Sequence, residues 1–192
     1  MKKPIIGLTV DSSCDKFYSD YPWYALRENY CDSIHPTTKL NPERSSFDYA
    51  FVKRTLAHKI PFLGICAGQQ MLNIVRGGTL IQSISDESPH ALNHSQEECR
   101  HKPTHDIHIT ENTLLSRCNN QSAKAAINSS HHQSVKVLGD NLITSALAPD
   151  GIIEGIEDPS LPFCLGVQWH PEFFVCDLDR EIYKKFIKAS EK

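Results

Sequence analysis

The stretch 61–78 carries the residues best placed to do chemistry. Cys66 lies between Gly64 and Gly68, two residues from each, and the hydrophobic period changes at the cysteine from strand-like to helix-like. This pattern predicts a strand, a sharp turn and a helix, the cysteine version of the Gly-x-Ser-x-Gly nucleophile elbow. We therefore expect Cys66 to be presented rather than buried. At a helix N-terminus, the dipole and the backbone N–H groups lower a thiol pKa from roughly 8.5 into a reactive range. A buried cysteine in an ordinary turn is the alternative.

A second candidate group, His170-Pro-Glu172, follows an apolar run about a hundred residues downstream. Pro171 disfavours helical geometry at His170, so we expect the histidine to end a strand. Such a histidine can act as general base toward a cysteine, and a nearby carboxylate can hold the imidazole in the required tautomer. We expect Glu172 to be that carboxylate.

Two further polar groups interrupt apolar surroundings. Gln70 lies one helical turn after Cys66, on the same face of the expected helix. The run Asn-Ser-Ser-His-His-Gln at 128–133 precedes a strand-like segment. By composition alone, a solvated loop explains this run equally well.

A metal site is the other chemistry to consider, because Cys99, His101, His105 and His108 are close in sequence. The run 105–110 alternates like a half-buried strand, which places His105 and His108 on opposite faces. Joint coordination is then awkward. We expect no metal and no cofactor.

Composition narrows the class of protein. The chain has 192 residues and a formal net charge of −3, so nucleic acid and anionic membranes are poor partners. The seven cysteines are odd in number and form no Cys-x-x-Cys pair, and the N-terminus lacks the apolar region of a signal peptide. No run approaches the roughly 20 apolar residues that span a bilayer. We expect a cytoplasmic protein forming a single domain over residues 1–192.

The order of elements indicates an α/β fold. We expect helices at 21–34, 46–58 and 178–189 besides the one after Cys66, and strands before Cys66 and at 4–10, 79–82, 107–110, 126–128, 135–138, 142–147, 152–156 and 163–168. The first two helices follow one another with only a polar, proline-broken segment between them. A parallel sheet needs a strand there. We therefore expect strands to be missing between Ile34 and His35, either by a true deletion or by omission from the sequence.

Four motifs together resemble the class I glutamine amidotransferase-like superfamily, and most closely its γ-glutamyl-γ-aminobutyrate hydrolase-like members. They are Gly-Ile-Cys-Ala-Gly-Gln-Gln (64–70), Gly-Val-Gln-Trp-His-Pro-Glu (166–172), Asn-Ser-Ser-His-His-Gln-Ser (128–134) and Ala-Pro-Asp-Gly-Ile-Ile-Glu (148–154). The resemblance implies a flavodoxin-like parallel or mixed sheet flanked by helices. It also implies that the interval at 34–35 normally holds two strands and a Gly-Gly loop that completes the oxyanion hole.

The resemblance further implies a mechanism and a set of site residues. A thiolate attacks the γ-carbonyl of a γ-glutamyl amide, and a Cys-His-Glu triad carries the reaction through a γ-glutamyl thioester. The residues concerned are Cys66, His170 and Glu172 as triad, Ala67 as oxyanion donor, and Gln70, Ser130, His131 and His132 toward the substrate. Ala67 departs from the pattern, because hydrolase-like members usually carry arginine there and amidotransferases an apolar residue.

Three functions stay open from the sequence. The first is a γ-glutamyl amide hydrolase that acts alone on a small molecule. The second is the glutaminase subunit of an amidotransferase, which hands ammonia to a synthase. The third is a catalytically impaired remnant, which the missing strands favour. A homodimer formed through the opened sheet edge is a possible assembly.

Overall fold

The computed structural model describes residues 42–96 and 100–191. The expected strand at 4–10, the helix at 21–34 and the junction of Ile34 with His35 lie outside these residues. In chain order, the described elements are α1 (Pro42–Ala57), β1 (Phe62–Ile65), α2 (Ala67–Val75), β2 (Thr79–Ile81), α3 (Ile84–Glu87), β3 (His105–Ile109), α4 (Leu114–Cys118), β4 (Lys124–Ile127), β5 (Ser134–Val137), β6 (Ile143–Leu147), β7 (Ile153–Glu157), β8 (Cys164–Val167), the 3₁₀ turn η2 (Pro171–Phe173) and α5 (Asp177–Ser190).

The strands form one mixed sheet. Its order is β1-β8-β7-β6-β3-β4, and β5 branches from β7 to pair with β2. β1 and β8 run parallel in register, with Phe62 opposite Cys164 and Ile65 opposite Val167. The other pairings between the described strands are antiparallel. The carboxyl ends of β1 and β8 therefore meet at one edge of the sheet, where ligands bind in open α/β sheets.

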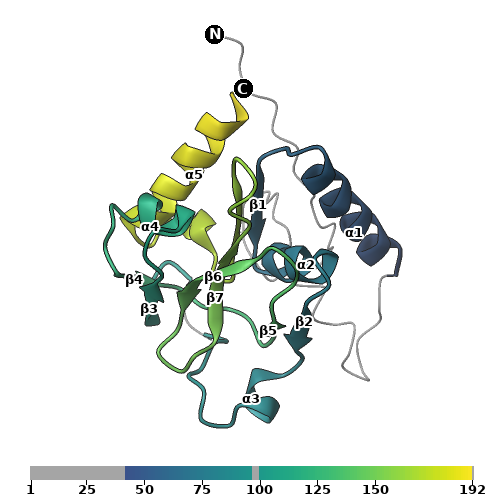
Figure 1. Cartoon of the computed structure of the whole chain (residues 1–192). Coiled ribbons are helices and arrows are strands. Elements are labelled where there is room, and N and C mark those ends of the chain that lie inside the picture. Colours follow the sequence, from purple (N-terminus) through teal and green to yellow (C-terminus); the bar gives the residue numbers. More distant parts are fainter. Residues whose placement is uncertain (1–41, 97–99, 192) are drawn as a thin grey trace, which may run out of the picture.

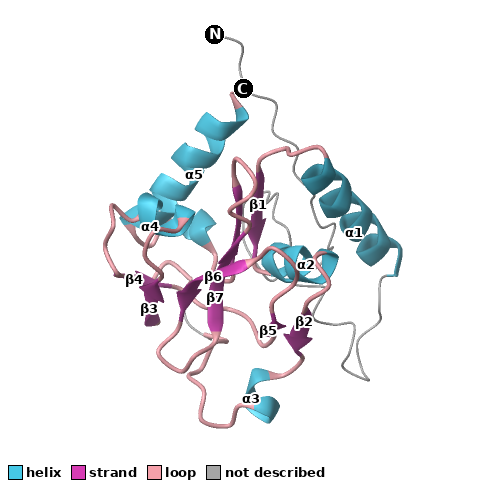
Figure 2. Cartoon of the chain, in the orientation of Figure 1, coloured by secondary structure: helices cyan, strands magenta, loops and turns pink. Residues whose placement is uncertain are grey.

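Helices cover both faces of the sheet (Figures 1 and 2). Leu165 and Val167 of β8 pack with Ile182 of α5, whereas Cys164 packs with Leu72 of α2. Because each face is covered, all four residues of β8 are buried. The expected α/β fold with a mixed sheet is confirmed.

Most of the expected elements in the described residues are present, with shifted ends. The helix expected at 46–58 begins at Pro42, and proline suits the first turn of a helix. The one-turn helix α4 was not expected. Its first N–H groups are capped from a distant strand, because Glu157 accepts hydrogen bonds from Leu114 N at 2.7 Å and Leu115 N at 3.2 Å. Thr113 caps the helix locally by accepting from Ser116 N at 3.0 Å, but the part supplied by Glu157 comes from 42 and 43 residues away and could not be predicted from spacing.

No helix in the described part of the chain is both long enough and apolar enough to cross a bilayer.

Candidate active site

The backbone at Cys66 is strained in the manner of a nucleophile elbow. Cys66 has φ 50° and ψ −106°, which a residue with a side chain rarely adopts. Strain of this kind costs about 1–3 kcal/mol. Gly64 is required by the same turn, because a Cβ there would lie 2.6 Å from the backbone C and O of Gly68. At Gly68 a Cβ would meet nothing within 4 Å. The sharp turn between β1 and α2 is thus built as the spacing predicts.

The expectation that Cys66 is presented to solvent is wrong. Its relative exposure is 0%. The turn carries the thiol back toward β8, where Cys66 N donates to Val167 O at 2.8 Å and Gln168 Nε2 donates to Cys66 Sγ at 3.5 Å. Gln168, which directly follows β8, thus contacts the sulfur. The elbow geometry is present, but the thiol is enclosed by the protein.

Cys66 also begins α2. Its carbonyl accepts from Gln69 N at 3.0 Å and Gln70 N at 3.2 Å, and Ala67 is the first residue of the helix. The first N–H groups of a helix have no partner within it. The N–H of Ala67, which directly follows Cys66, is one of these groups.

His170 and Glu172 form a close pair beyond the end of β8. His170 Nδ1 lies 2.8 Å from Glu172 Oε1. A carboxylate only accepts, so Nδ1 carries the proton, and a neutral imidazole then has its lone pair on Nε2. His170 has φ −111° and ψ 82°, outside the helical region, and Pro171 begins η2 directly after it. The non-helical geometry expected at His170 is confirmed, but the histidine does not end a strand, because β8 ends at Val167.

Asn128 holds the backbone of His170 from both sides. Asn128 Oδ1 accepts from His170 N at 2.9 Å, and Asn128 Nδ2 donates to His170 O at 3.0 Å. Nδ2 also donates to Arg100 O at 2.8 Å. The sequence places Asn128 in a polar run but does not reveal this role, because the partners are 42 residues apart.

A chain of buried amides runs from Gln70 to the cysteine. Gln70 Nε2 donates to Gln168 Oε1 and to Gln133 O, each at 3.2 Å, and Gln168 in turn contacts Cys66. The position of Gln70, one turn after Cys66 and facing the same region, agrees with the helical spacing. Sequence reasoning missed Gln168, although it lies within the motif that ends in Glu172.

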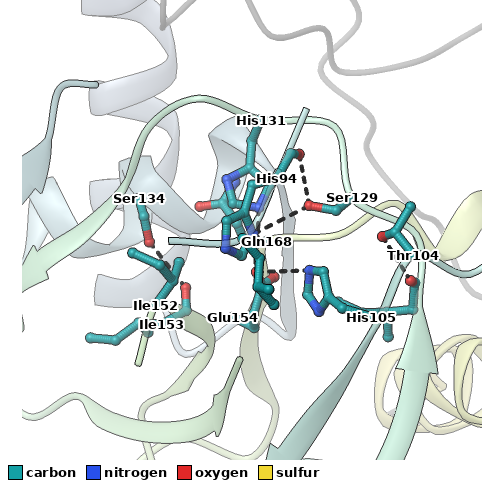
Figure 3. A network of polar contacts seen from close by, with 12 residues as sticks. His94, Thr104, His105, Ser129, His131, Ser134, Ile152, Ile153, Glu154 and Gln168 are labelled. Carbon is teal, nitrogen blue, oxygen red and sulfur yellow. Dashed lines mark hydrogen bonds and ion pairs between the residues drawn. The ribbon is translucent and has the colours of Figure 1, made fainter. Parts of the chain in front are cut away.

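The other expected substrate-binding residues are placed differently from one another. His132 is exposed, whereas Ser130 and His131 are buried. Ser130 forms an isolated antiparallel bridge with Ser95. The ring of His131 is turned toward Glu154 on β7, with Nε2 3.4 Å from Oε1 (Figure 3).

Glu154 is the centre of a buried charged network. Burial disfavours its ionised form, but His131 and His94 outweigh that effect and lower the pKa of Glu154 to about 2. Burial likewise opposes protonation of His94, yet Glu154 and Asp150 raise the pKa of His94 above its usual value. Burial raises the pKa of Asp150, but hydrogen bonds from His94, Leu92 N and Ile152 N lower that pKa by more, so its net shift is downward.

The alternation predicted for 105–110 is confirmed, since His105 is half-buried and His108 is exposed on the other face of β3. Cys99 lies outside the described residues. His101 is exposed.

Comparison with known proteins places the chain among relatives of one family. The chain is 32% identical to a glutamine amidotransferase-like protein of Rickettsia prowazekii over 277 aligned positions, covering 99% of each. That alignment is longer than the 192 residues of this chain, so the relative has residues without a counterpart here. The γ-glutamyl-γ-aminobutyrate hydrolase PuuD of Escherichia coli K12 is 33% identical over 158 residues, which are 79% of this chain and 62% of that protein. The chain thus spans less than two thirds of that relative's length.

The fold is shared with solved structures. The glutaminase domain of Trypanosoma brucei CTPS, solved with bound acivicin, superposes with a TM-score of 0.58 at 22% identity, over 80% of this chain and 68% of that one. The model of the peptidase C26 family matches residues 4–172. The chain therefore belongs to the peptidase C26 family, within the class I glutamine amidotransferase-like group.

Proposed function

We propose that the chain hydrolyses γ-glutamyl amide bonds, with Cys66 as nucleophile and His170 as general base and acid. One observation carries the proposal. The strained turn at Cys66 ends β1, and the His170–Glu172 pair at 2.8 Å follows β8, the strand parallel to β1. Both groups thus belong to the same carboxyl edge of the sheet. The family relationship to named γ-glutamyl hydrolases supports the choice of bond.

The proposed reaction has two halves. His170 takes the thiol proton, and the Cys66 thiolate attacks the γ-carbonyl while Ala67 N–H donates to the oxyanion. The tetrahedral intermediate expels the amine, which leaves with the proton from His170. Water, activated by His170, then attacks the γ-glutamyl thioester and releases glutamate and the thiol. Glu172 holds the imidazole in the tautomer that both halves require.

The proposed substrate pocket uses polar groups beside the cysteine. Gln70 donates a hydrogen bond to Gln168, and Gln168 in turn donates to Cys66 Sγ. Ser130 and His132 belong to the loop whose Asn128 holds His170, whereas the ring of His131 in the same loop faces Glu154 and supports the loop from behind. A γ-glutamyl group presents an α-amine and an α-carboxylate, and such neutral amides and hydroxyls can pair with both.

The glutaminase function is the second candidate, because the fold is also that of a CTPS glutaminase domain. The two functions differ in the leaving group, which is ammonia from glutamine or a larger amine from a γ-glutamyl amide. Preference for glutamine, and stimulation by a synthase, would favour the glutaminase.

The test is glutamate release by the purified full-length chain from a series of γ-glutamyl amides and from glutamine. We expect release from γ-glutamyl amides that is abolished in Cys66→Ala. Cys118→Ala is the matched control, because Cys118 is equally buried but lies in α4. Activity that survives in Cys66→Ala would overturn the assignment. A folded wild-type chain that releases no glutamate from any of these substrates would favour the impaired remnant.

A further inference from the structure

Three histidine rings surround one buried carboxylate oxygen, and none of these residues belongs to the proposed triad (Figure 3). Glu154 Oε1 lies 3.1 Å from His94 Nδ1, 3.4 Å from His131 Nε2 and 3.8 Å from His105 Nε2. The side chains of Glu154 and His131 are 0% exposed, and those of His94 and His105 are 1% and 6% exposed. Donor atoms of His94, His105 and Glu154 all lie within 4.8 Å of one another.

The outer nitrogens of two of these rings are fixed by backbone carbonyls. His131 Nδ1 lies 2.9 Å from Gln133 O, and His105 Nδ1 lies 3.1 Å from Asp106 O. A carbonyl oxygen only accepts, so both Nδ1 atoms carry protons. In the neutral rings, the inner Nε2 atoms then hold lone pairs, and these face a carboxylate.

The third ring, His94, is held in the same way by a carboxylate. His94 Nε2 lies 2.9 Å from Asp150 Oδ2, which leaves Nδ1 on the inner side toward Glu154, with Ser129 Oγ 3.4 Å from it. Histidines that bind metals almost always donate their other ring N–H to a carboxylate, a backbone carbonyl or water. All three rings have this second partner.

The donor atoms of His105, His131 and Glu154 that face one another have no partner in the described part of the chain that would offset their repulsion, and a cation between them would supply one. Within the described residues, His105 Nε2, His131 Nε2 and both oxygens of Glu154 make no hydrogen bond, although all four atoms are buried. Lone pairs that face one another in a low dielectric repel, and buried polar atoms without partners cost free energy. Protonating all three rings would remove the repulsion between their lone pairs and the carboxylate. It would also bury three positive charges beside one another, with only the two negative charges of Glu154 and Asp150 to balance them.

The spacing also fits a tetrahedral ion. Zinc lies about 2.0–2.1 Å from histidine nitrogen and about 2.0–2.2 Å from carboxylate oxygen, so neighbouring ligand atoms of a tetrahedral site are about 3.3 Å apart. The measured separations from Glu154 Oε1 range from 3.1 to 3.8 Å and bracket that value. The donors of His94, His105 and Glu154 lie within 4.8 Å of one another, whereas His131 approaches through Glu154 Oε1, so its ring must move inward to complete the tetrahedron. Imidazole and carboxylate donors suit Zn²⁺.

We propose that His94, His105, His131 and Glu154 form a zinc site. With four protein ligands and almost no exposure, it is a closed, structural site. The ion joins β3 and β7 to the segments around residues 94 and 131, the second of which also carries Asn128. This site differs from the zinc ligands considered from the sequence, Cys99, His101, His105 and His108, and only His105 is common to both.

The experiment measures metal content of the full-length chain, purified without a histidine tag. We expect one zinc per chain by elemental analysis, a higher Tm for the zinc-loaded chain than for chelator-treated chain, and recovery of that Tm on adding Zn²⁺. His105→Ala should lose the zinc. His108→Ala is the matched control, because it removes an exposed histidine from the same strand, and it should keep the zinc. Asp150→Asn keeps all four ligands and should weaken zinc binding by about 10- to 100-fold.

Cobalt distinguishes this site from adventitious binding by cysteine. Co²⁺ loaded in place of zinc should give the visible absorption of a tetrahedral ion without a thiolate charge-transfer band, and Cys66→Ala should bind as well as wild type. The result is therefore independent of the hydrolase proposal. A thiolate band, equal binding by wild type and His105→Ala, or a wild-type chain that takes up no zinc would overturn the proposal. A wild-type chain that takes up no zinc would mean that protons alone, and no metal ion, join the three histidines to Glu154.

Discussion

We expect Cys66 to be more reactive than the other cysteines that the structure describes. Burial raises the thiol pKa of Cys118 and Cys164 to about 12, and that of Cys176 to about 11. Cys66 is buried as well, but it lies at the N-terminus of α2, where a thiolate is stabilised. We expect iodoacetamide at neutral pH to alkylate Cys66 faster than these three, as measured by peptide mass spectrometry. Because Cys66 and Cys118 are equally covered, equal rates at the two would show that the elbow does not activate its thiol.

The roles proposed for His170 and Glu172 predict unequal mutants. His170→Ala removes the group that carries the proton, so kcat should fall by about 10²- to 10⁴-fold. Glu172→Gln keeps an acceptor within reach of Nδ1 and should lower kcat less. Steady-state kinetics on a γ-glutamyl amide measure both. Equal losses, or a larger loss in Glu172→Gln, would contradict the proposed order of roles.

How far residues could be identified from sequence depends on how local their geometry is. The elbow at Cys66 and the His170–Glu172 pair are each set within a few residues, so spacing was sufficient. Gln168 was missed because its role depends on a contact 102 residues away in sequence. The exposure of Cys66 was predicted wrongly for the same reason, since Gln168, which contacts its sulfur, is distant in sequence.

At the scale of elements, Gly64 and Gly68 occupy equivalent places in the motif around Cys66, but the turn between β1 and α2 leaves room for a side chain at only one of them. Gly64→Ala would force a Cβ to within 2.6 Å of the Gly68 backbone, whereas Gly68→Ala adds a Cβ with nothing within 4 Å. We expect the first change to lower the free energy of unfolding by about 1–3 kcal/mol or more. The second replaces a helical glycine and should raise it by up to about 1 kcal/mol. Urea unfolding of the two variants tests this directly, and similar effects from both would refute the geometry.

Element prediction succeeded where hydrophobic period decides and failed where distant contacts decide. The strand expected at 163–168 appears as Cys164–Val167, and the final helix expected at 178–189 appears as Asp177–Ser190. The helix α4 was missed because Glu157, on β7, supplies part of its cap. The metal candidate at Glu154 was missed too, because its ligands come from four segments that no spacing connects.

At the scale of the whole molecule, the chain is shorter than the relatives it matches, and this predicts weak catalysis. The resemblance implies that the residues missing near Ile34 include the second oxyanion donor. One such donor is worth about 2.7–4 kcal/mol, or roughly 10²- to 10³-fold in kcat. We expect kcat below that of the Escherichia coli hydrolase by about this factor when both are assayed on the same γ-glutamyl amide. A kcat equal to that of the longer relative would show that the described residues provide a complete oxyanion hole.

The strained backbone at Cys66 predicts which residue would replace the cysteine if the thiol were no longer under selection. Glycine adopts φ 50° and ψ −106° without the roughly 1–3 kcal/mol that a side chain adds there, and a domain is stable by only about 5–15 kcal/mol. A single codon change from cysteine to glycine would thus stabilise the turn while removing the thiol. In a lineage free to drift, this position would be among the first to lose its side chain. We therefore expect the cysteine to persist only in relatives that use the thiol.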